Sequence, residues 1–356
     1  MGAPIRVLLI APSLDILGGQ AVQATRLMKN LSRDPELQMA FQPINPRIGW
    51  LRRIPYLRTL CTLAIYCLSV LTRAPRYDIL HVFSASYWSY TLWTIPAWIA
   101  AKLFGKKIVL NYRDGQCEDH LRNWRTALPT IRRMDAVITP SGYLVDVFWK
   151  FGIEARSFFN IIDMTEFRYR RRSGLRPAFL HNRILEPIYD IQTALRAFQA
   201  VQEKYPEASL KVAHDGPSRG ELEAFAAGLG LRNYQFLGRV PHQRIPELYD
   251  SVDLYLTSPV FDCMPGSLLE CFASGLPVIA TRAGGIPYIA EHDRTAILVE
   301  CGDWRGMADE ALRLLEDPAR VERLTGAAYS ECRRYDAGPV CAQWAGLYRE
   351  LTGRAS

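Results

Sequence analysis

The chain has 356 residues, of which 49% are hydrophobic and 22% are charged, a globular composition that excludes a disordered or fibrous protein. At about 100–200 residues per domain, this length predicts two domains. The net charge of +7 indicates an anionic partner. We expect no nucleic acid, because the sequence has neither a recognition-helix motif nor a basic patch interleaved with aromatic residues.

The first predicted strand is RVLLIAP at 6–12, followed by a turn at Gly18 and Gly19 and a helical pattern. The amino terminus lacks the pattern of a signal peptide, and Arg6 stands where a myristoylation signal has Ser or Thr. No membrane-spanning helix is predicted. We therefore expect a cytoplasmic protein, and the eight cysteines, which form no C-x-x-C pair, are expected to be reduced thiols rather than metal ligands.

Residues 52–76 place an apolar, aromatic run between basic residues at both ends, namely Arg52, Arg53, Arg58, Arg73 and Arg76. Such a segment would lie on an anionic bilayer with its guanidinium groups at the headgroups. We predict a peripheral contact with the inner face of the cell membrane through this segment. A buried helix with basic ends explains the pattern equally well.

Strand-like runs follow at 77–86, 106–115 and 134–141, each before a helical stretch. This alternation predicts a parallel sheet with helices on both faces. The aromatic stretch 84–105 would pack as a helix; the alternative is stacking on sugar rings or contact with lipid by Tyr87, Trp88, Tyr90 and Trp93.

The same rhythm restarts at 176–184, so we predict an α/β protein with two doubly wound Rossmann-like domains facing across a cleft. The domains would be 1–168 and 169–334, joined near the polar stretch 165–176. Residues 335–356 would form a helix, broken near Gly338 and Pro339, that packs back on the first domain. Ligands of open α/β sheets bind at the carboxyl ends of the strands, so we expect the site in the cleft.

A turn between two acids stands at 261–270, FDCMPGSLLE. Proline and glycine forbid a regular helix before SLLECFASG, so a helix starts there with unpaired N–H groups that suit a phosphate. Glu270 can accept hydrogen bonds from a ribose diol, and Asp262 from sugar hydroxyls. The layout predicts a site for a nucleotide-diphosphate sugar, with a plain capping turn as the alternative. The amides expected to face the phosphate are those of Cys263, Met264, Gly266, Ser267 and Leu268.

The stretch from SPVFDCMPGSLLECFASGLPVIA to TRAGGIPYIAE resembles the signature of retaining GT-B glycosyltransferases of family GT4. Glu270 matches the second acid of the family's E-x7-E motif, and Asp262 stands where the first Glu usually is. The resemblance spans most of the chain and is strongest over about 235–300. It implies a GT-B fold, a nucleotide-sugar donor, a glycan or lipid-linked acceptor, and no metal or cofactor.

The resemblance extends to other positions. Gly18 and Gly19 match a glycine loop near the donor phosphates, and Arg183 matches an arginine on the donor diphosphate. The stretch FLGRVP at 236–241, which includes Val240, matches a segment whose backbone contacts the nucleotide base.

Several positions depart from the family pattern. Arg113 occupies the slot of a usual His, and it cannot act as a base at neutral pH. Ile188 and Tyr288 replace a usual Lys and a usual acid, and His214 replaces a glycine without expected harm. His120, seven residues after Arg113, is expected at the surface.

In the mechanism suggested for such folds, the leaving diphosphate takes the acceptor proton, and catalysis reduces to positioning and charge stabilisation. The catalytic residues implied are Asp262, Arg183 and Arg113. Two alternatives stay open: a catalytically silent homologue that binds a nucleotide-sugar or partners an active enzyme, and a UDP-sugar epimerase, for which no further acid/base residues are found.

Overall fold

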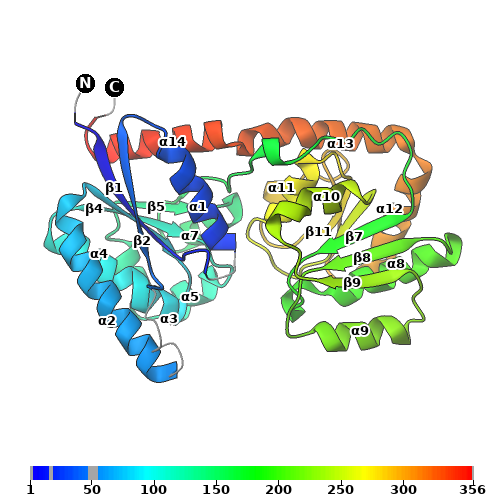
Figure 1. The fold of residues 1–356 in the computed structure, drawn as a ribbon, viewed down its shortest axis with the longest axis horizontal. Coiled ribbons are helices and arrows are strands. Elements are labelled where there is room, and N and C mark those ends of the chain that lie inside the picture. The colour runs from blue at the N-terminus through cyan, green and yellow to red at the C-terminus, as the bar shows by residue number, and fades with distance from the viewer. Residues whose placement is uncertain (1–2, 16–18, 47–54, 355–356) are drawn as a thin grey trace. The chain divides into compact units, whose positions relative to one another are not determined.

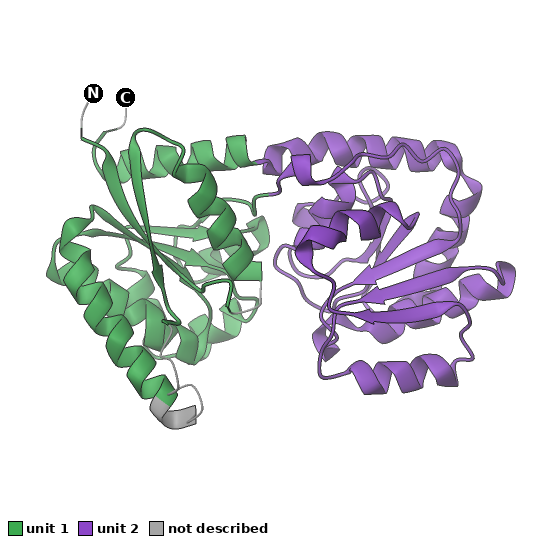
Figure 2. Ribbon diagram, in the orientation of Figure 1, with its two compact units in different colours: residues 1–161, 337–356 green, residues 162–336 purple. Residues whose placement is uncertain are grey.

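The computed structural model describes residues 3–15, 19–46 and 55–354 (Figure 1). The chain divides into two compact units, Met1–Ile161 with Ala337–Ser356 (unit 1) and Ile162–Asp336 (unit 2) (Figure 2). The sequence placed these changeovers at 168 and 334.

Unit 1 is built on a six-stranded parallel sheet in the order β2-β1-β3-β4-β5-β6. Its strands are β1 Ile5–Ala11, β2 Leu37–Pro43, β3 Ile79–Ser84, β4 Lys107–Tyr112, β5 Ala136–Thr139 and β6 Arg156–Ser157. The edge strands β2 and β6 were not predicted. Only two of the seven residues in β2 are buried and β6 has two residues, so neither leaves a continuous apolar run in the sequence.

Both faces of the unit 1 sheet are covered by helices, as the burial of successive β1 side chains in two different cores shows. Val7 and Leu9 pack in one core with Trp344, while Leu8 and Ile10 pack in another with Tyr66. Since successive side chains of a strand point to opposite faces, β1 is buried on both sides, as a doubly wound sheet requires. The helices of this unit are α1 Gly19–Leu31, α2 Pro55–Arg73, α3 Tyr87–Ser89, α4 Ile95–Leu103, α5 Cys117–Asn123, α6 Ala127–Ile131, α7 Gly142–Lys150 and α14 Ala337–Leu351, with a π-helical segment at Tyr90–Thr94.

The last helix, α14, is not broken near Gly338 and Pro339, which corrects the sequence prediction. It starts at Ala337 after a 3-10 turn at Arg333–Tyr335. Pro339 therefore falls in the first turn, where a backbone N–H would have no acceptor within the helix, so the proline removes no hydrogen bond.

Unit 2 holds a second six-stranded parallel sheet, in the order β12-β11-β10-β7-β8-β9. Its strands are β7 Ala178–Asn182, β8 Ser209–Ala213, β9 Tyr234–Gly238, β10 Leu254–Thr257, β11 Val278–Thr281 and β12 Ile297–Val299, and its helices are α8 Ile191–Lys204, α9 Arg219–Gly228, α10 Ile245–Asp250, α11 Gly266–Ala273, α12 Trp304–Glu316 and α13 Pro318–Cys332. The strand order reverses between β7 and β10. The carboxyl ends of these two strands therefore meet at the switch point where open α/β sheets bind ligands.

The stretch 165–176 is more than a polar join, which also corrects the sequence analysis. Arg172 is 2% exposed and donates hydrogen bonds to main-chain carbonyls of unit 2. Among the described residues, none of the helices has the length and apolar character needed to cross a membrane.

Candidate functional site

Arg183 and Asp262 form an ion pair at the switch point of the unit 2 sheet. Arg183 follows β7 and Asp262 follows β10, and their side chains are 15% and 10% exposed. The guanidinium carbon also lies 4.3 Å from the centroid of the Tyr189 ring, a cation–π contact. The second carboxylate oxygen of Asp262 accepts the N–H of Met264 at 3.1 Å.

The guanidinium of this pair keeps its positive charge although little of it is exposed to solvent. Burial by itself would lower the pKa of Arg183, but the Asp262 carboxylate raises it overall, so the guanidinium stays cationic at neutral pH. Burial raises the pKa of Asp262, and the positive charge of Arg183 opposes that rise. The Nε of Arg183 is buried and has no hydrogen-bond partner in the described part of the chain. The site thus has a cation with an unused donor.

The loop that carries Asp262 is clamped by the glycines after β11. Gly285 donates its N–H to the Asp262 carbonyl at 2.7 Å. Gly284 has φ +53°, and a Cβ on it would lie 2.4 Å from the same carbonyl oxygen. Only glycine fits so close an approach with this backbone conformation.

The start of α11 lies directly after the Asp262 loop and has no side-chain cap. Two of the amides predicted to face a phosphate are used internally: Met264 donates to Asp262, and Leu268 donates to the Pro265 carbonyl at 3.2 Å. Among the described residues, the N–H groups of Gly266 and Ser267 have no hydrogen bond. These two donors carry the partial positive charge of the helix start.

Glu270 lies one turn into α11 and is half-buried. Its Oε2 accepts a hydrogen bond from the Tyr249 hydroxyl at 2.8 Å. Nothing in the sequence singles out Tyr249, since a tyrosine inside a short helix carries no distinguishing signal.

The segment around Val240, predicted to contact the base, follows β9, and Val240 itself is half-buried. The N–H of His214 donates to the Gly238 carbonyl at 2.8 Å. His214 adopts φ +81°, a region that non-glycine residues avoid. The replacement of a glycine by His214 is therefore not harmless, because it costs roughly 1 kcal/mol of backbone strain.

The remaining predicted site residues belong to unit 1. Gly18 lies outside the described residues, and Gly19 is the first residue of α1. Arg113 follows β4 and donates to the Oδ1 atoms of Asn111 (2.9 Å) and Asn160 (2.6 Å). Their roles toward a donor stay predictions.

His120 is buried, not at the surface as expected. Its Nδ1 lies 2.9 Å from the Tyr112 hydroxyl, and the rings of Tyr87, Tyr90 and Trp124 surround it. Burial lowers its pKa to about 4, so it is a neutral core residue. All eight cysteines are free thiols, and no cluster of His, Cys, Asp or Glu able to hold a metal occurs within the described residues.

Comparison with known proteins places this site in a family. Residues 179–317, which include Arg183, Val240, Asp262 and Glu270, match the model of "Glycosyl transferases group 1". Unit 2 is a glycosyl transferases group 1 domain. The sulfoquinovosyl transferase SQD2 of Arabidopsis thaliana is 30% identical over 194 residues, 53% of this chain and 36% of that protein. The chain spans between a fifth and a half of the length of the first curated relatives it matches.

Solved structures resemble the whole chain. Anabaena HepE, crystallised with UDP-glucose, has a TM-score of 0.77 at 18% identity, over 97% of this chain and 100% of that one. The sucrose-phosphate synthase of Thermosynechococcus elongatus has a TM-score of 0.81 at 17% identity, over 98% and 99%. Together with the two sheets, they confirm the predicted α/β fold of GT-B type beyond the glycosyl transferases group 1 domain.

Proposed function

We propose that this protein is a retaining glycosyltransferase of family GT4 that transfers a sugar from a nucleotide-diphosphate sugar to a glycan or lipid-linked acceptor. The observation that carries the proposal is the order of groups at the unit 2 switch point: Arg183, Asp262, the open amides of α11, then Glu270. The family match, the transferase names of the relatives and the UDP-glucose bound by HepE support the same donor class.

Each group has one task in this reaction. Arg183 and the amides of Gly266 and Ser267 stabilise the negative charge that develops on the leaving diphosphate. Asp262 accepts hydrogen bonds from the sugar, and Glu270 accepts them from the ribose. As the anomeric carbon–oxygen bond breaks, the acceptor oxygen attacks from the same face and its proton passes to the leaving phosphate oxygen. No protein base is needed, which fits Arg113 in the position of the family's His.

Donor binding would exchange partners in the Arg183–Asp262 pair. The pair is partly buried and Asp262 already neutralises the guanidinium, so an arriving phosphate competes with the carboxylate for Arg183. Once displaced, Asp262 becomes available to the sugar hydroxyls. Until a donor binds, the Arg183 cation opposes the rise in the pKa of Asp262 that burial causes.

The test is turnover of UDP-, GDP- and ADP-sugars by the purified protein, first without acceptor and then with candidate glycans. We expect slow hydrolysis of one donor that Arg183→Ala reduces strongly, and NMR of the transferred product should show the donor's anomeric configuration retained. Donor binding without turnover of any kind would favour the silent homologue, to which Ile188 and Arg113 point. Binding of no donor would contradict both.

We also propose that α2 rests on an anionic bilayer, where a lipid-linked acceptor would be found. Tyr66 and Val70 of α2 are buried in the unit 1 core, yet Leu60 and Leu68 on its outer side are each 65% exposed and Ile65 is 46% exposed. A helix apolar on both sides needs an apolar medium on both. Helix α2 contains no acidic residue.

Neighbouring features fit this surface. Arg58 and Arg76 are exposed at the two ends of the helical segment, and α4, which packs against α2, exposes Ile99 and Leu103. Arg52 and Arg53, also predicted to contact lipid, lie outside the described residues. Basic residues beside an apolar strip suit anionic headgroups.

Sedimentation with liposomes tests the surface. The protein should bind phosphatidylcholine vesicles that contain phosphatidylglycerol and lose binding in Leu60→Ser/Leu68→Ser. Trp149→Ser is the matched control, since Trp149 is 76% exposed in α7 and belongs to neither helix. If the wild type does not sediment with the vesicles, the proposed bilayer contact is wrong. A concentration-dependent dimer that the same double substitution abolishes would show instead that a second copy of the chain covers this surface.

A further inference from the structure

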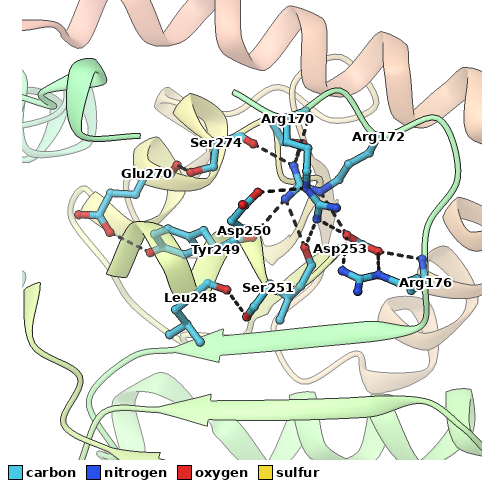
Figure 3. Close-up of polar contacts among 12 residues, drawn as sticks. Arg170, Arg172, Arg176, Leu248, Tyr249, Asp250, Ser251, Asp253, Glu270 and Ser274 are labelled. Atoms are coloured by element: carbon cyan, nitrogen blue, oxygen red, sulfur yellow. Dashed lines mark hydrogen bonds and ion pairs between the residues drawn. The ribbon is translucent and has the colours of Figure 1, made fainter. Parts of the chain in front are cut away.

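Tyr249 lies between two polar side chains of unit 2. It lies in α10 and is fully buried. Its hydroxyl oxygen is 2.8 Å from Oε2 of Glu270 and 3.1 Å from Nδ2 of Asn182, the last residue of β7. Figure 3 shows the Tyr249 hydroxyl pointing to the Glu270 carboxylate.

The direction of these hydrogen bonds is fixed by chemistry. An ionised carboxylate only accepts, and an amide nitrogen only donates. The hydroxyl therefore accepts from Asn182 and gives its single proton to Glu270. This occupies Oε2, while no group among the described residues hydrogen-bonds Oε1 of Glu270.

The main chain that carries the pair is held by Arg172. Its guanidinium donates to the Tyr249 carbonyl at 3.1 Å, at the end of α10, and to the Ser274 carbonyl at 2.8 Å, at the end of α11. Both contacts appear in Figure 3, where Asp253 pairs with the neighbouring arginines. Burial lowers the pKa of Arg172 to about 10, so it is still cationic at neutral pH. One cation thus ties together the two helices that present Tyr249 and Glu270.

We infer that Tyr249 is a positioning residue for the ribose of the donor nucleotide, acting through Glu270. The inference rests on the proposed function, in which Glu270 accepts the ribose hydroxyls. With Oε2 tied to Tyr249, the carboxylate keeps one rotamer and presents Oε1 to the diol. Binding then avoids the entropy loss of ordering a flexible glutamate.

The test compares Tyr249→Phe with wild type by calorimetry. The ligands are whichever of UDP, GDP and ADP binds best to the wild type, and its 2′,3′-dideoxy form. Loss of a hydrogen bond that orients a charged group should weaken binding of the ribose form about tenfold. Binding of the dideoxy form should stay within twofold, because that ligand offers Glu270 nothing to bind. Tyr66→Phe is the matched control, since it removes a buried hydroxyl that donates to a carbonyl in unit 1.

The remaining outcomes separate this inference from the proposal beneath it. Equal weakening for both ligands, or no weakening, would overturn the positioning role. Glu270→Ala should weaken binding of the ribose form more than binding of the dideoxy form. If it weakens both equally, or if the wild type binds none of the nucleotides, the assignment of Glu270 to the ribose fails and the inference fails with it. Should Tyr249→Phe not fold, Asn182→Ala is expected to show the same dependence on the ribose hydroxyls, and its absence there would equally count against the idea.

Discussion

Arg183 and Asp262, 79 residues apart in the chain, form a partly buried ion pair across the switch point of the unit 2 sheet. The two residues follow β7 and β10, which are adjacent strands. The chain continues from β7 to β8 on one side of this pair and from β10 to β11 on the other side. The pair occupies the place where the proposed reaction needs a cation for the diphosphate and an acceptor for the sugar.

Asp262→Asn should separate these two tasks. Without the carboxylate, Arg183 is free for phosphate, so affinity for a plain nucleoside diphosphate should hold or rise while sugar turnover falls. An unpaired buried cation costs up to about 3–5 kcal/mol, so the ligand-free variant should melt at a lower temperature, and nucleotide should restore more stability than it gives the wild type. Thermal shifts with and without ligand measure both. A loss of nucleotide affinity equal to the loss of turnover would contradict the exchange.

Glu270→Ala should weaken nucleotide binding. A hydrogen bond to a charged group contributes roughly 1.5–3 kcal/mol, which corresponds to more than a tenfold change in Kd. Calorimetric titration is the measurement, and an affinity within twofold of the wild type would show that the site is wrongly assigned.

Gly284→Ala tests the clamp on the Asp262 loop. A methyl group there would lie 2.4 Å from the Asp262 carbonyl oxygen, so we expect lower stability together with weaker donor binding. Gly230→Ala is the control: Gly230 also has a positive φ, +67°, but has open space around its Cβ position. The control should lose only the roughly 1 kcal/mol of strain typical of such a conformation. Equal donor affinity in the two variants would remove the loop from the site.

Buried histidines should make stability depend on pH. Burial lowers the pKa of His120 to about 4 and of His181 to about 3, and it lowers that of His81 as well. In the unfolded chain these rings take up a proton near pH 6.5. The unfolded state therefore binds more protons below that pH, and stability should fall as the pH drops from about 6.5 toward 4.

His181→Leu isolates one of these contributions. Neither ring nitrogen of His181 has a hydrogen-bond partner in the described residues, so the substitution by leucine removes no hydrogen bond. The variant should match or exceed the wild type at pH 7, and its advantage should grow at pH 5 by up to about 1.4 kcal/mol per pH unit. Denaturant unfolding at the two values provides the measurement. An advantage that shrinks on acidification would contradict the buried neutral state.

The sequence alone determined the architecture and the local part of the site. Most inner strands are buried on both faces and left a short, mainly apolar run, although β3 contains His81 and β8 contains Lys211. The restart of the rhythm near 176 marked the second sheet. Arg183 and the turn before Glu270 directly follow such runs. The rule that ligands bind where strands end is consistent with both positions. It pointed to the turn, whereas Arg183 was selected through the resemblance to family GT4.

Tertiary structure decided which polar groups are buried and what they contact. Arg172 lies in a stretch that reads as a solvated join, yet it bonds to a carbonyl 102 residues away, and Tyr249 meets a carboxylate 21 residues away. His120 was expected at the surface for the same reason, whereas edge strand β2 was missed because only two of its seven residues are buried. Periodicity reports how a residue relates to its own element, whereas burial of a charge or a hydroxyl depends on partners that only the folded chain brings within bonding distance.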